Sequence, residues 1–324
     1  MRVFTVLLCL LLAGSLTTFG QNQQPTEIAK RIQQAKSSKA KFQTASVFEA
    51  AGEVKSAGKF KSMVADGQLL QLDLTALQSL FKANHEAIEF ELPLPEKKKM
   101  TLELVRHEML TDDFSVVTSE SNGAPITWQP GVYYQGIVRG DPTSLAAISV
   151  FDGEVMGIIS TVAEGDMVLG KTDSKINATD YIFYKERDLL LTNDFHCETE
   201  DTPVDTSKDP IVGSSKVLKC VRAYLECEYD LVTEKGGATG ATNFITGLFN
   251  VVALLYQNEQ ITTTLSQVFT WTTPDSYPTS STSAALNSFK STRPNYNGDV
   301  AHLISRGAPS GGGIAWVDAL CSSY

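Results

Sequence analysis

The sequence predicts an α+β fold, in which a β-rich antiparallel region precedes an α/β region with a mixed sheet. Three observations support this prediction. From about residue 90 to residue 182, short apolar segments alternate with tight-turn signals at close spacing, which is typical of antiparallel sheets. After residue 212, longer elements follow one another as strand, helix, strand, helix and strand. Between these regions, residues 193–210 are acidic and poor in apolar side chains, which predicts an exposed linker.

The first twenty residues have the features of a secretory signal. Met1 and Arg2 precede an apolar run from Val3 to Leu12, and small and polar residues follow through Gly20. An uncleaved anchor is the alternative, but the run is shorter than the roughly 20 apolar residues that span a bilayer. We therefore expect residues 1–20 to be removed and the chain to be secreted. No second apolar run of spanning length follows, so we expect no membrane span after cleavage.

The N-terminal half opens with helical patterns and continues with strands. Ile28, Ile32 and Ala35 recur at helical spacing within residues 25–37, which predicts a helix. A strand that turns into a short helix after Asp73 is expected within residues 70–80. Further strands are predicted at residues 100–105, 114–118, 133–138, 145–151, 155–161 and 167–169. Turn signals that contain Gly123, Gly140, Gly153 and Gly165 separate them, and the pattern indicates a self-contained antiparallel β domain.

The C-terminal region alternates longer elements. Strands are predicted at residues 217–229, 261–271, 300–305 and 313–317, and helices at residues 241–257 and 283–290. We expect this α/β region to be an incomplete domain that leaves an apolar helix face and a sheet face uncovered, and uncovered apolar surface favours association.

Charge and histidine content exclude several functions. The formal net charge of −10 argues against nucleic acid as a partner. The HExxH motif places two zinc-binding histidines on one face of a helix, with a glutamate beside them as base. Only four histidines occur, namely His85, His107, His196 and His302. His85 and His107 are each followed by Glu, but Glu89 and Thr111 stand where the second histidine would be. The motif is therefore absent, and no catalytic residue is predicted.

Four cysteines remain after the signal, namely Cys197, Cys220, Cys227 and Cys321. Export makes disulfides possible. Cys220 and Cys227 fall seven residues apart in one predicted strand, so they lie roughly 20 Å apart and cannot pair with each other. Asn177, followed by Ala178 and Thr179, fits a glycosylation acceptor.

Three blocks of sequence together resemble the reprolysin (adamalysin) branch of the metzincin zinc peptidases. The first, which is similar to the propeptide strands of that family, comprises Tyr134-Gln-Gly136, residues 144–149, Asp152-Gly153 and residues 156–158. The second, which is similar to the opening strand, helix and second strand of the peptidase domain, comprises residues 221–231, 248–256 and 261–271. The third comprises Asp299-x-Ala301-x-Leu303-Ile304, then Gly313-Ile-Ala-Trp316 and Cys321.

The resemblance implies a domain organisation. Residues 1–20 would be the signal peptide and residues 21–192 a propeptide domain that is β-rich from about residue 90. Residues 193–210 would be the acidic linker, and residues 211–324 the N-terminal part of a metallopeptidase domain. That last part would be an incomplete zincin-like α/β domain, because we expect the sequence to stop before the family's HExxHxxGxxH motif.

The resemblance also implies roles for single residues. Cys197 would be a cysteine switch whose thiolate holds the zinc of the complete enzyme, although Glu198 follows it where the family usually has Gly. A paired or free linker cysteine is the alternative. Gly313, Ile314, Ala315 and Trp316 would form the edge strand that binds extended substrate through main-chain hydrogen bonds. The alternative for these residues is an ordinary buried edge.

Two further residues match family positions. Asp299 matches a calcium-binding position, but Arg222 stands where a second acidic residue is expected, so a helix or turn cap is the alternative. Cys321 matches a cysteine whose disulfide partner would lie beyond the end of this chain.

The function that follows is a secreted, reprolysin-like zinc metalloendopeptidase precursor. The complete enzyme would use zinc and act on peptide or protein substrates. This chain would bind no catalytic zinc and would be inactive by itself, because it lacks the zinc-binding helix. The alternative is a non-catalytic secreted binding or inhibitory module built from the propeptide and the partial peptidase domain.

Overall fold

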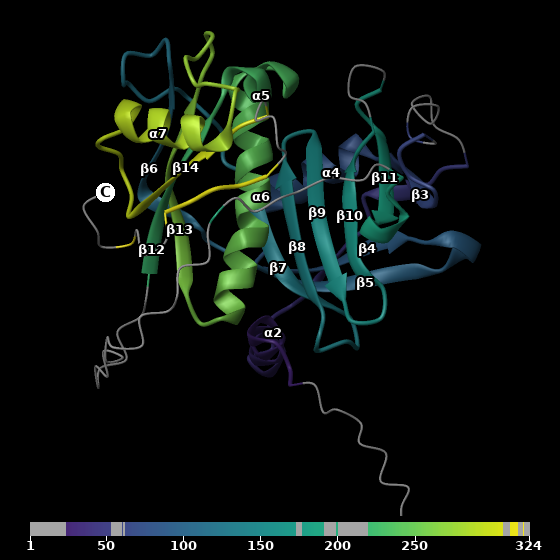
Figure 1. The fold of residues 1–324 in the computed structure, drawn as a ribbon. Coiled ribbons are helices and arrows are strands. Elements are labelled where there is room, and N and C mark those ends of the chain that lie inside the picture. The colour runs from purple at the N-terminus through teal and green to yellow at the C-terminus, as the bar shows by residue number, and fades with distance from the viewer. Residues whose placement is uncertain are drawn as a thin grey trace, which may run out of the picture.

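Two β-sheets pack on opposite sides of helix α6 (Ala238–Asn258), so that this helix lies between them (Figure 1). The computed structural model describes residues 24–52, 60, 62–172, 177–190, 199, 220–306, 312–316 and 320. The predicted signal peptide, Cys197, His196 and Cys321 lie outside these described residues. The fold is α+β, as predicted, with strands in both halves of the sequence.

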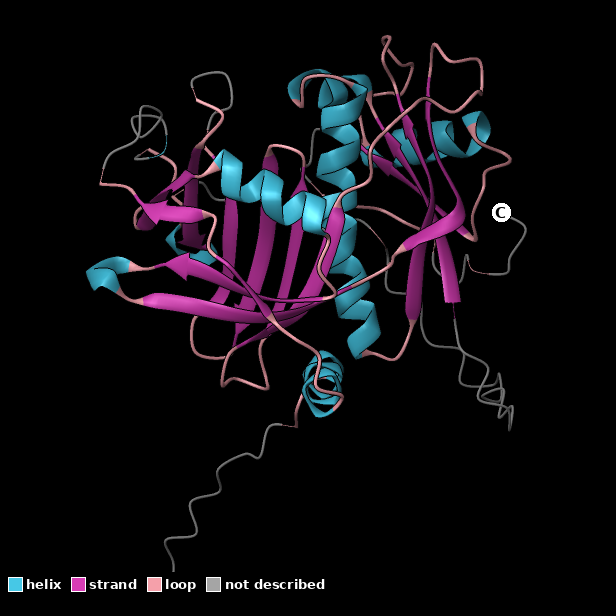
Figure 2. Ribbon diagram, turned by 180° about the vertical axis from the view of Figure 1, so that it is seen from behind, coloured by secondary structure: helices cyan, strands magenta, loops and turns pink. Residues whose placement is uncertain are grey.

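The larger sheet has ten strands and curls around its own core (Figure 2). In spatial order the strands are β1 (Gln43–Ala45), β4 (Ala87–Pro93), β5 (Lys99–Arg106), β7 (Val132–Val138), β8 (Leu145–Phe151), β9 (Glu154–Thr161), β10 (Gly165–Lys171), β11 (Asp180–Lys185), β3 (Gly67–Leu72) and β2 (Phe48–Ala50). Neighbouring strands are antiparallel except β1 and β4, which are parallel, so the sheet is mixed. Phe90, Leu102, Tyr134 and Ile148 are fully buried in its core.

Helices and tight turns of the N-terminal half form where local side chains favour them. Helix α2 (Glu27–Ser37) begins after Thr26, whose side chain accepts a hydrogen bond from the Ala29 N–H. Helix α4 (Leu74–Ala83) begins after Asp73, whose carboxylate accepts from two backbone N–H groups of the first turn. Two short 3-10 helices are η1 (Pro95–Lys97) and η2 (Glu186–Asp188). Gly153 and Gly165 have φ values of 87° and 73° in the turns between β8, β9 and β10, which favours glycine there.

The smaller sheet has four parallel strands in the order β14-β12-β13-β6. Three of them alternate with helices as predicted: β12 (Cys220–Cys227), α5 (Tyr229–Glu234), α6, β13 (Thr262–Thr270), α7 (Thr282–Thr292) and β14 (Val300–Ile304). The prediction of a mixed sheet is wrong for the described strands of this region, because every pair in it is parallel.

Strand β6 (Leu110–Thr118) comes from the N-terminal half but belongs to the smaller sheet. It pairs in parallel with β13, and Ser115 lies opposite Gln267. The prediction of a self-contained β domain is therefore wrong. Without β6, strand β13 would present a row of unpaired N–H and C=O groups at the edge of the sheet, and β6 satisfies them.

Helix α6 has two covered faces. Ala241, Ile245 and Phe249 pack in one apolar cluster with Leu225 of β12 and Leu265 of β13. The opposite face contacts β7, β8 and β9 of the larger sheet. The expected uncovered apolar face is therefore found only in part, because the larger sheet covers one side of α6 while Val252, Leu255 and Tyr256 are exposed near its C-terminal end. Among the helices that the structure describes, α6 is the one long and apolar enough to cross a membrane, but half of its apolar window is buried in the protein.

Candidate functional site

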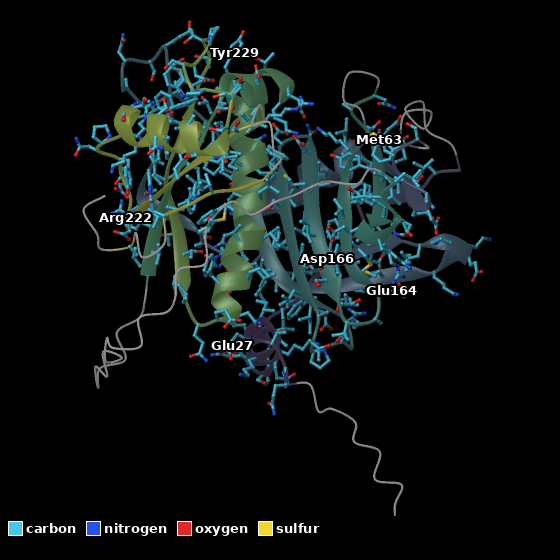
Figure 3. All side chains as sticks on the ribbon, viewed as in Figure 1. Glu27, Met63, Glu164, Asp166, Arg222 and Tyr229 are labelled. Atoms are coloured by element: carbon cyan, nitrogen blue, oxygen red, sulfur yellow. The ribbon has the colours of Figure 1, made fainter. Side chains whose placement is uncertain are left out.

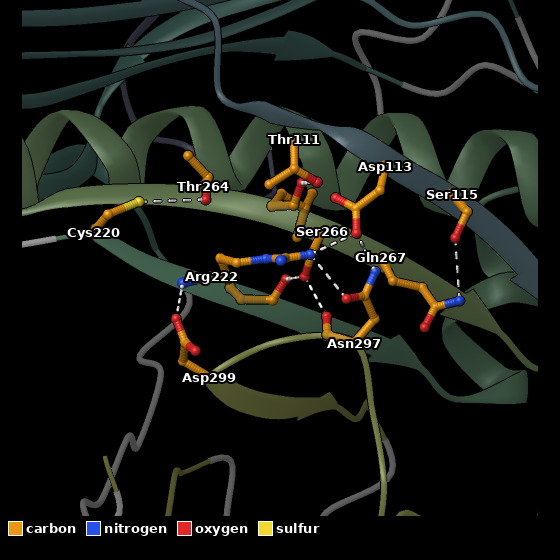
Figure 4. A network of polar contacts seen from close by, with 12 residues as sticks. Thr111, Asp113, Ser115, Cys220, Arg222, Thr264, Ser266, Gln267, Asn297 and Asp299 are labelled. Carbon is orange, nitrogen blue, oxygen red and sulfur yellow. Dashed lines mark hydrogen bonds and ion pairs between the residues drawn. The ribbon is translucent and has the colours of Figure 1, made fainter. Parts of the chain in front are cut away.

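Asp299, the predicted calcium position, lies directly before β14 and binds the backbone of β12. Its Oδ2 accepts a hydrogen bond of 2.8 Å from the Arg222 N–H, and its own N–H donates to the Arg222 carbonyl at 2.7 Å (Figure 4). The carboxylate therefore ties the segment before β14 to the neighbouring strand, instead of capping a helix or turn. Its role as a calcium ligand stays a prediction.

Arg222 supplies a fixed positive charge beside this position. Its Nη2 donates to Asp113 Oδ2 of β6 at 2.7 Å and to Asn297 Oδ1 at 2.9 Å (Figure 4). Asn297 also donates to Asp113 at 3.2 Å. Hydrogen bonds from Thr111, Arg222 and Asn297 lower the pKa of Asp113 to about 2, so this carboxylate is ionised at neutral pH. A bound cation would otherwise contact the Asp113 carboxylate, but the guanidinium of Arg222 already neutralises its charge.

A second polar centre surrounds Glu226 on the face of the smaller sheet away from α6. The Glu226 side chain is fully buried and accepts four hydrogen bonds. The donors are Tyr224 Oη (2.7 Å), Trp271 Nε1 (2.6 Å), Tyr277 Oη (2.6 Å) and Arg293 Nε (2.5 Å). The guanidinium of Arg293 lies 4.0 Å from the centre of the Phe269 ring. Four donors saturate the carboxylate, so it anchors the structure and is not free to take up a substrate proton.

The charge states around Glu226 follow from its burial. Burial acts to lower the pKa of Arg293, but the hydrogen bond and ion pair with Glu226 outweigh it and the pKa is raised. Burial, together with the Glu226 charge, raises the pKa of Tyr224 and of Tyr277. This centre was not predicted from the sequence. The available signal was Glu226 itself, an acidic residue between Leu225 and Cys227 in a mostly apolar strand.

A third acidic position lies where β12 ends. Glu228 is buried and accepts a hydrogen bond of 2.6 Å from Ser305 Oγ. Burial raises the pKa of Glu228, the hydrogen bond from Ser305 opposes the rise, and Asp275 adds to it. The next residue, Tyr229, donates its N–H to Asp275 at 2.9 Å. Tyr229 and Glu27 of α2 lie at opposite ends of the molecule in Figure 3. These contacts join α5 to the loop after β13.

The predicted substrate edge, Gly313 to Trp316, is only partly extended. Gly313 forms a single β-bridge, and residues 314–316 have no regular secondary structure. The Ala315 N–H donates to Thr199 Oγ1 at 3.0 Å, so this segment contacts the predicted linker. Lys290 of α7 lies over the Trp316 ring at 5.3 Å. The predicted strand at residues 313–317 is therefore not found in the described part, and its substrate-binding role stays a prediction.

The cysteines and histidines agree in part with the sequence predictions. Cys220 is exposed and Cys227 is buried, and both are free, which confirms that they do not pair with each other. Burial raises the pKa of Cys227 to about 12, and the Glu226 charge adds to the rise. His302 lies on β14 and His107 lies between β5 and β6, and burial lowers the pKa of both, that of His107 to about 4. The cysteine switch at Cys197 and the disulfide at Cys321 lie outside the described residues.

Metal-binding side chains do not converge in the described structure. Within residues 24–306 and 312–320, apart from the gaps stated above, no group of three or more His, Cys, Asp or Glu residues is placed to hold a metal ion. The residues described here therefore do not fit a catalytic zinc site, and no step of peptide hydrolysis is assigned to them.

The parallel β14-β12-β13 sheet with its helices defines the C-terminal region as an α/β domain. Residues 217–324 match the family Reprolysin_5, described as Metallo-peptidase family M12. The resemblance to the reprolysin-like metallopeptidases is therefore shown over this region. Peptidases of this family depend on zinc and act on peptides.

The crystal structure of metalloproteinase-II from Bacteroides fragilis is similar over 65% of this chain and 60% of that chain, at 10% identity and a TM-score of 0.34. This chain thus spans 60% of the length of that structure's chain. A comparison with curated proteins gave no match.

Proposed function

We propose that this chain is the precursor of a secreted zinc metalloendopeptidase of the reprolysin type. Residues 21–192 are its propeptide domain, and residues 211–324 are the N-terminal part of its peptidase domain. The pairing of β6 with β13 supports the proposal most strongly. A strand from the N-terminal half completes the sheet of the region that matches the peptidase family, as expected for a propeptide that folds together with its enzyme.

This chain and the complete enzyme have different roles. Zinc, when bound in the complete enzyme, polarises the scissile carbonyl and activates a water molecule. The ligands for it belong to an HExxH motif that the 324 residues do not contain. We infer that the 324 residues by themselves hold no catalytic zinc and do not cleave peptides. Their contribution is to position substrate, through Gly313 to Trp316, and to maintain latency, through the N-terminal half and Cys197.

Two measurements test this function. The transcript is sequenced past the codon of Tyr324, and the purified 324-residue chain is assayed for zinc by mass spectrometry and for cleavage of fluorogenic peptides. We expect an open frame that continues into HExxHxxGxxH, and neither zinc nor cleavage in the purified chain. A stop codon directly after Tyr324 would favour the alternative, a non-catalytic binding or inhibitory module. One tightly held zinc with peptide cleavage would refute the proposed inactivity.

Secretion is tested separately. We propose that the chain is exported and processed after Gly20, because residues 1–20 have the pattern of a signal peptide. The chain is expressed in its natural host, and the N-terminus of the protein in the medium is sequenced. A mature terminus at Gln21 is the expected result, whereas retention of an intact Met1 inside the cell would contradict export.

A further inference from the structure

Helix α2 lies on the outer face of the larger sheet, below the C-terminal end of α6 (Figure 1). Its apolar side chains Ile28, Ala29 and Ile32 share one cluster with Ile137 of β7 and Leu254 of α6. This cluster contains far fewer buried side chains than the cores of the two sheets, so apolar burial stabilises the position of α2 less than that of the strands. The polar contacts of α2 therefore matter for its attachment.

Arg31 binds α2 to the end of α6. Its Nη1 donates to Gln257 Oε1 at 2.9 Å, and the nearby N–H of Glu27 donates to Asn258 Oδ1 at 3.1 Å. A cation is favourable there, because the helix dipole places partial negative charge at the C-terminus of α6. Burial lowers the pKa of Arg31. None of the ion pairs between described residues includes Arg31, so no carboxylate offsets its charge in this part of the chain.

His107 lies where the chain passes from β5 of the larger sheet to β6 of the smaller one. Its N–H donates to the Tyr133 carbonyl at 2.8 Å, which fixes its backbone against β7. The imidazole Nε2 is buried and has no hydrogen-bond partner among the residues that the structure describes. Uptake of a proton would make both ring nitrogens donors and leave a buried charge without an acceptor at Nε2. This environment therefore favours the neutral imidazole.

The charge that acts on His107 comes from α2. Burial, and secondly the charge of Arg31, lower the pKa of His107 to about 4. Beside it in the sequence, Arg106 and Glu108 pair with each other at 3.0 Å. Tyr133 of β7 is neutral, because burial raises its pKa, and the end of α6 presents uncharged amides. Arg31 is thus the group whose charge opposes protonation of His107.

We propose that His107 is an acid-sensitive latch for α2. The neutral imidazole tolerates Arg31, and α2 stays on the larger sheet and on α6. When His107 takes up a proton, two positive charges lie close together with no carboxylate between them. Opening of α2 relieves this repulsion, because water then reaches the imidazole and the guanidinium. The strands of both sheets stay paired, so the latch acts on the N-terminal helix and does not depend on the proposed function.

The test measures amide hydrogen exchange of the full chain at pH 6.5 and pH 4.5, with rates corrected for the pH dependence of the chemical exchange step. We expect opening of residues 27–37 to become at least about tenfold more frequent at pH 4.5. Helix α4, at another place on the larger sheet, is the internal reference and should change by less than about twofold. An α2 that responds no more than α4 would overturn the proposal, and so would an equal response of all elements.

A substitution of the histidine identifies the titrating group. His107→Gln cannot take up a proton in this range, so we expect opening of α2 to be the same at both pH values. The matched control is His302→Gln on β14, which removes the other histidine whose pKa burial lowers, and it should leave the acid response of α2 unchanged. Circular dichroism checks the fold of each variant. Acid opening in His107→Gln as large as in the unsubstituted protein would refute the latch.

A substitution of the arginine separates charge repulsion from a structural role. Arg31→Gln removes the charge, so the acid response of α2 should become at least about twofold smaller, and the midpoint of the His107 imidazole in an NMR titration should rise. A contact that is merely structural would instead raise opening equally at both pH values. This variant also tests the latch if His107→Gln does not fold. An unchanged acid response and an unchanged midpoint would contradict the proposal.

Discussion

Asp113 of β6 and Arg222 of β12 form an ion pair of 2.7 Å that reaches over the intervening strand β13. The two residues are 109 positions apart in the sequence, and they belong to opposite sides of the predicted linker. Asn297 bonds to both side chains (Figure 4). The ion pair thus adds a side-chain contact to the backbone pairing of β6 with β13. Together they hold the N-terminal half at the edge of the smaller sheet.

Replacing Arg222 should loosen β6 selectively. Arg222→Met removes the bonds to Asp113 and Asn297, and both charged partners are partly exposed, so we expect little change in global stability. Amide hydrogen exchange should become faster in residues 115–118 and stay unchanged in β8. The control is Lys30→Met, which removes the exposed pair with Glu27 on α2. Equal protection of β6 in both variants would refute a role for Arg222 in holding the strand.

The same pair predicts a dependence on pH. The pKa of Asp113 is lowered from its ordinary value of 3.8 to about 2, so its ionised form stabilises the folded state. This contribution is fully present above pH 3.8 and is lost as the pH falls through about 2. NMR titration of the Asp113 carboxyl carbon should give a midpoint near 2, and Arg222→Met should raise it. A midpoint near 3.8 in the unsubstituted protein would contradict the observed bonds.

Periodicity predicted most elements of the C-terminal region. Helices α6 and α7 and strands β12, β13 and β14 lie within a few residues of their predicted positions, because each carries its own apolar pattern. Asp73 was also identified correctly as the start of α4. Strand β11 and the short strands β1 and β2 were not predicted individually. They complete the sheet through long-range pairing and carry little local signal.

The partner of a strand cannot be read from its own residues. Residues 114–118 predicted a strand correctly, but the same alternation fits either sheet, so the transfer of β6 to β13 was not foreseen. Likewise, only the fold shows that the Asn250 side chain bonds to Tyr134, Gln135 and Ser149. Glu226 was overlooked for the same reason, since three of its four donors, Trp271, Tyr277 and Arg293, lie outside β12.

Glu226 should contribute strongly to stability. Glu226→Gln leaves the Arg293 guanidinium, whose side chain is 21% exposed, without its ionic partner. We expect the free energy of unfolding to fall by about 3 kcal/mol, as measured by urea denaturation. Glu234→Gln, at a 36% exposed side chain, is the control and should change it by less than about 0.5 kcal/mol. Equal effects of the two substitutions would show that the buried centre is not an anchor.

His107 should make the fold sensitive to mild acid. Burial, and secondly the charge of Arg31, lower its pKa to about 4 from 6.5. The folded state thus resists protonation, and stability that is present above pH 6.5 is lost as the pH falls toward 4. The loss is on the order of 3 kcal/mol. His107→Gln should abolish this part of the pH dependence in urea unfolding between pH 7 and pH 4. Parallel curves for the two proteins would disprove it.

The parallel pairing of β6 with β13 can be trapped covalently. Ser115 and Gln267 lie opposite each other, and Gln267 Nε2 donates to Ser115 Oγ at 3.2 Å. Adjacent strands place such Cα atoms about 4.8 Å apart, which is within the range that a disulfide bridges. In a Cys220→Ser background, Ser115→Cys with Gln267→Cys should form a crosslink on mild oxidation, detected by mass spectrometry of a digest. Ser115→Cys with Thr264→Cys, three residues before Gln267 on β13, should stay reduced. Crosslinking of the second pair but not the first would show that β6 occupies another register, and the absence of both would show that it is not paired with β13 in solution.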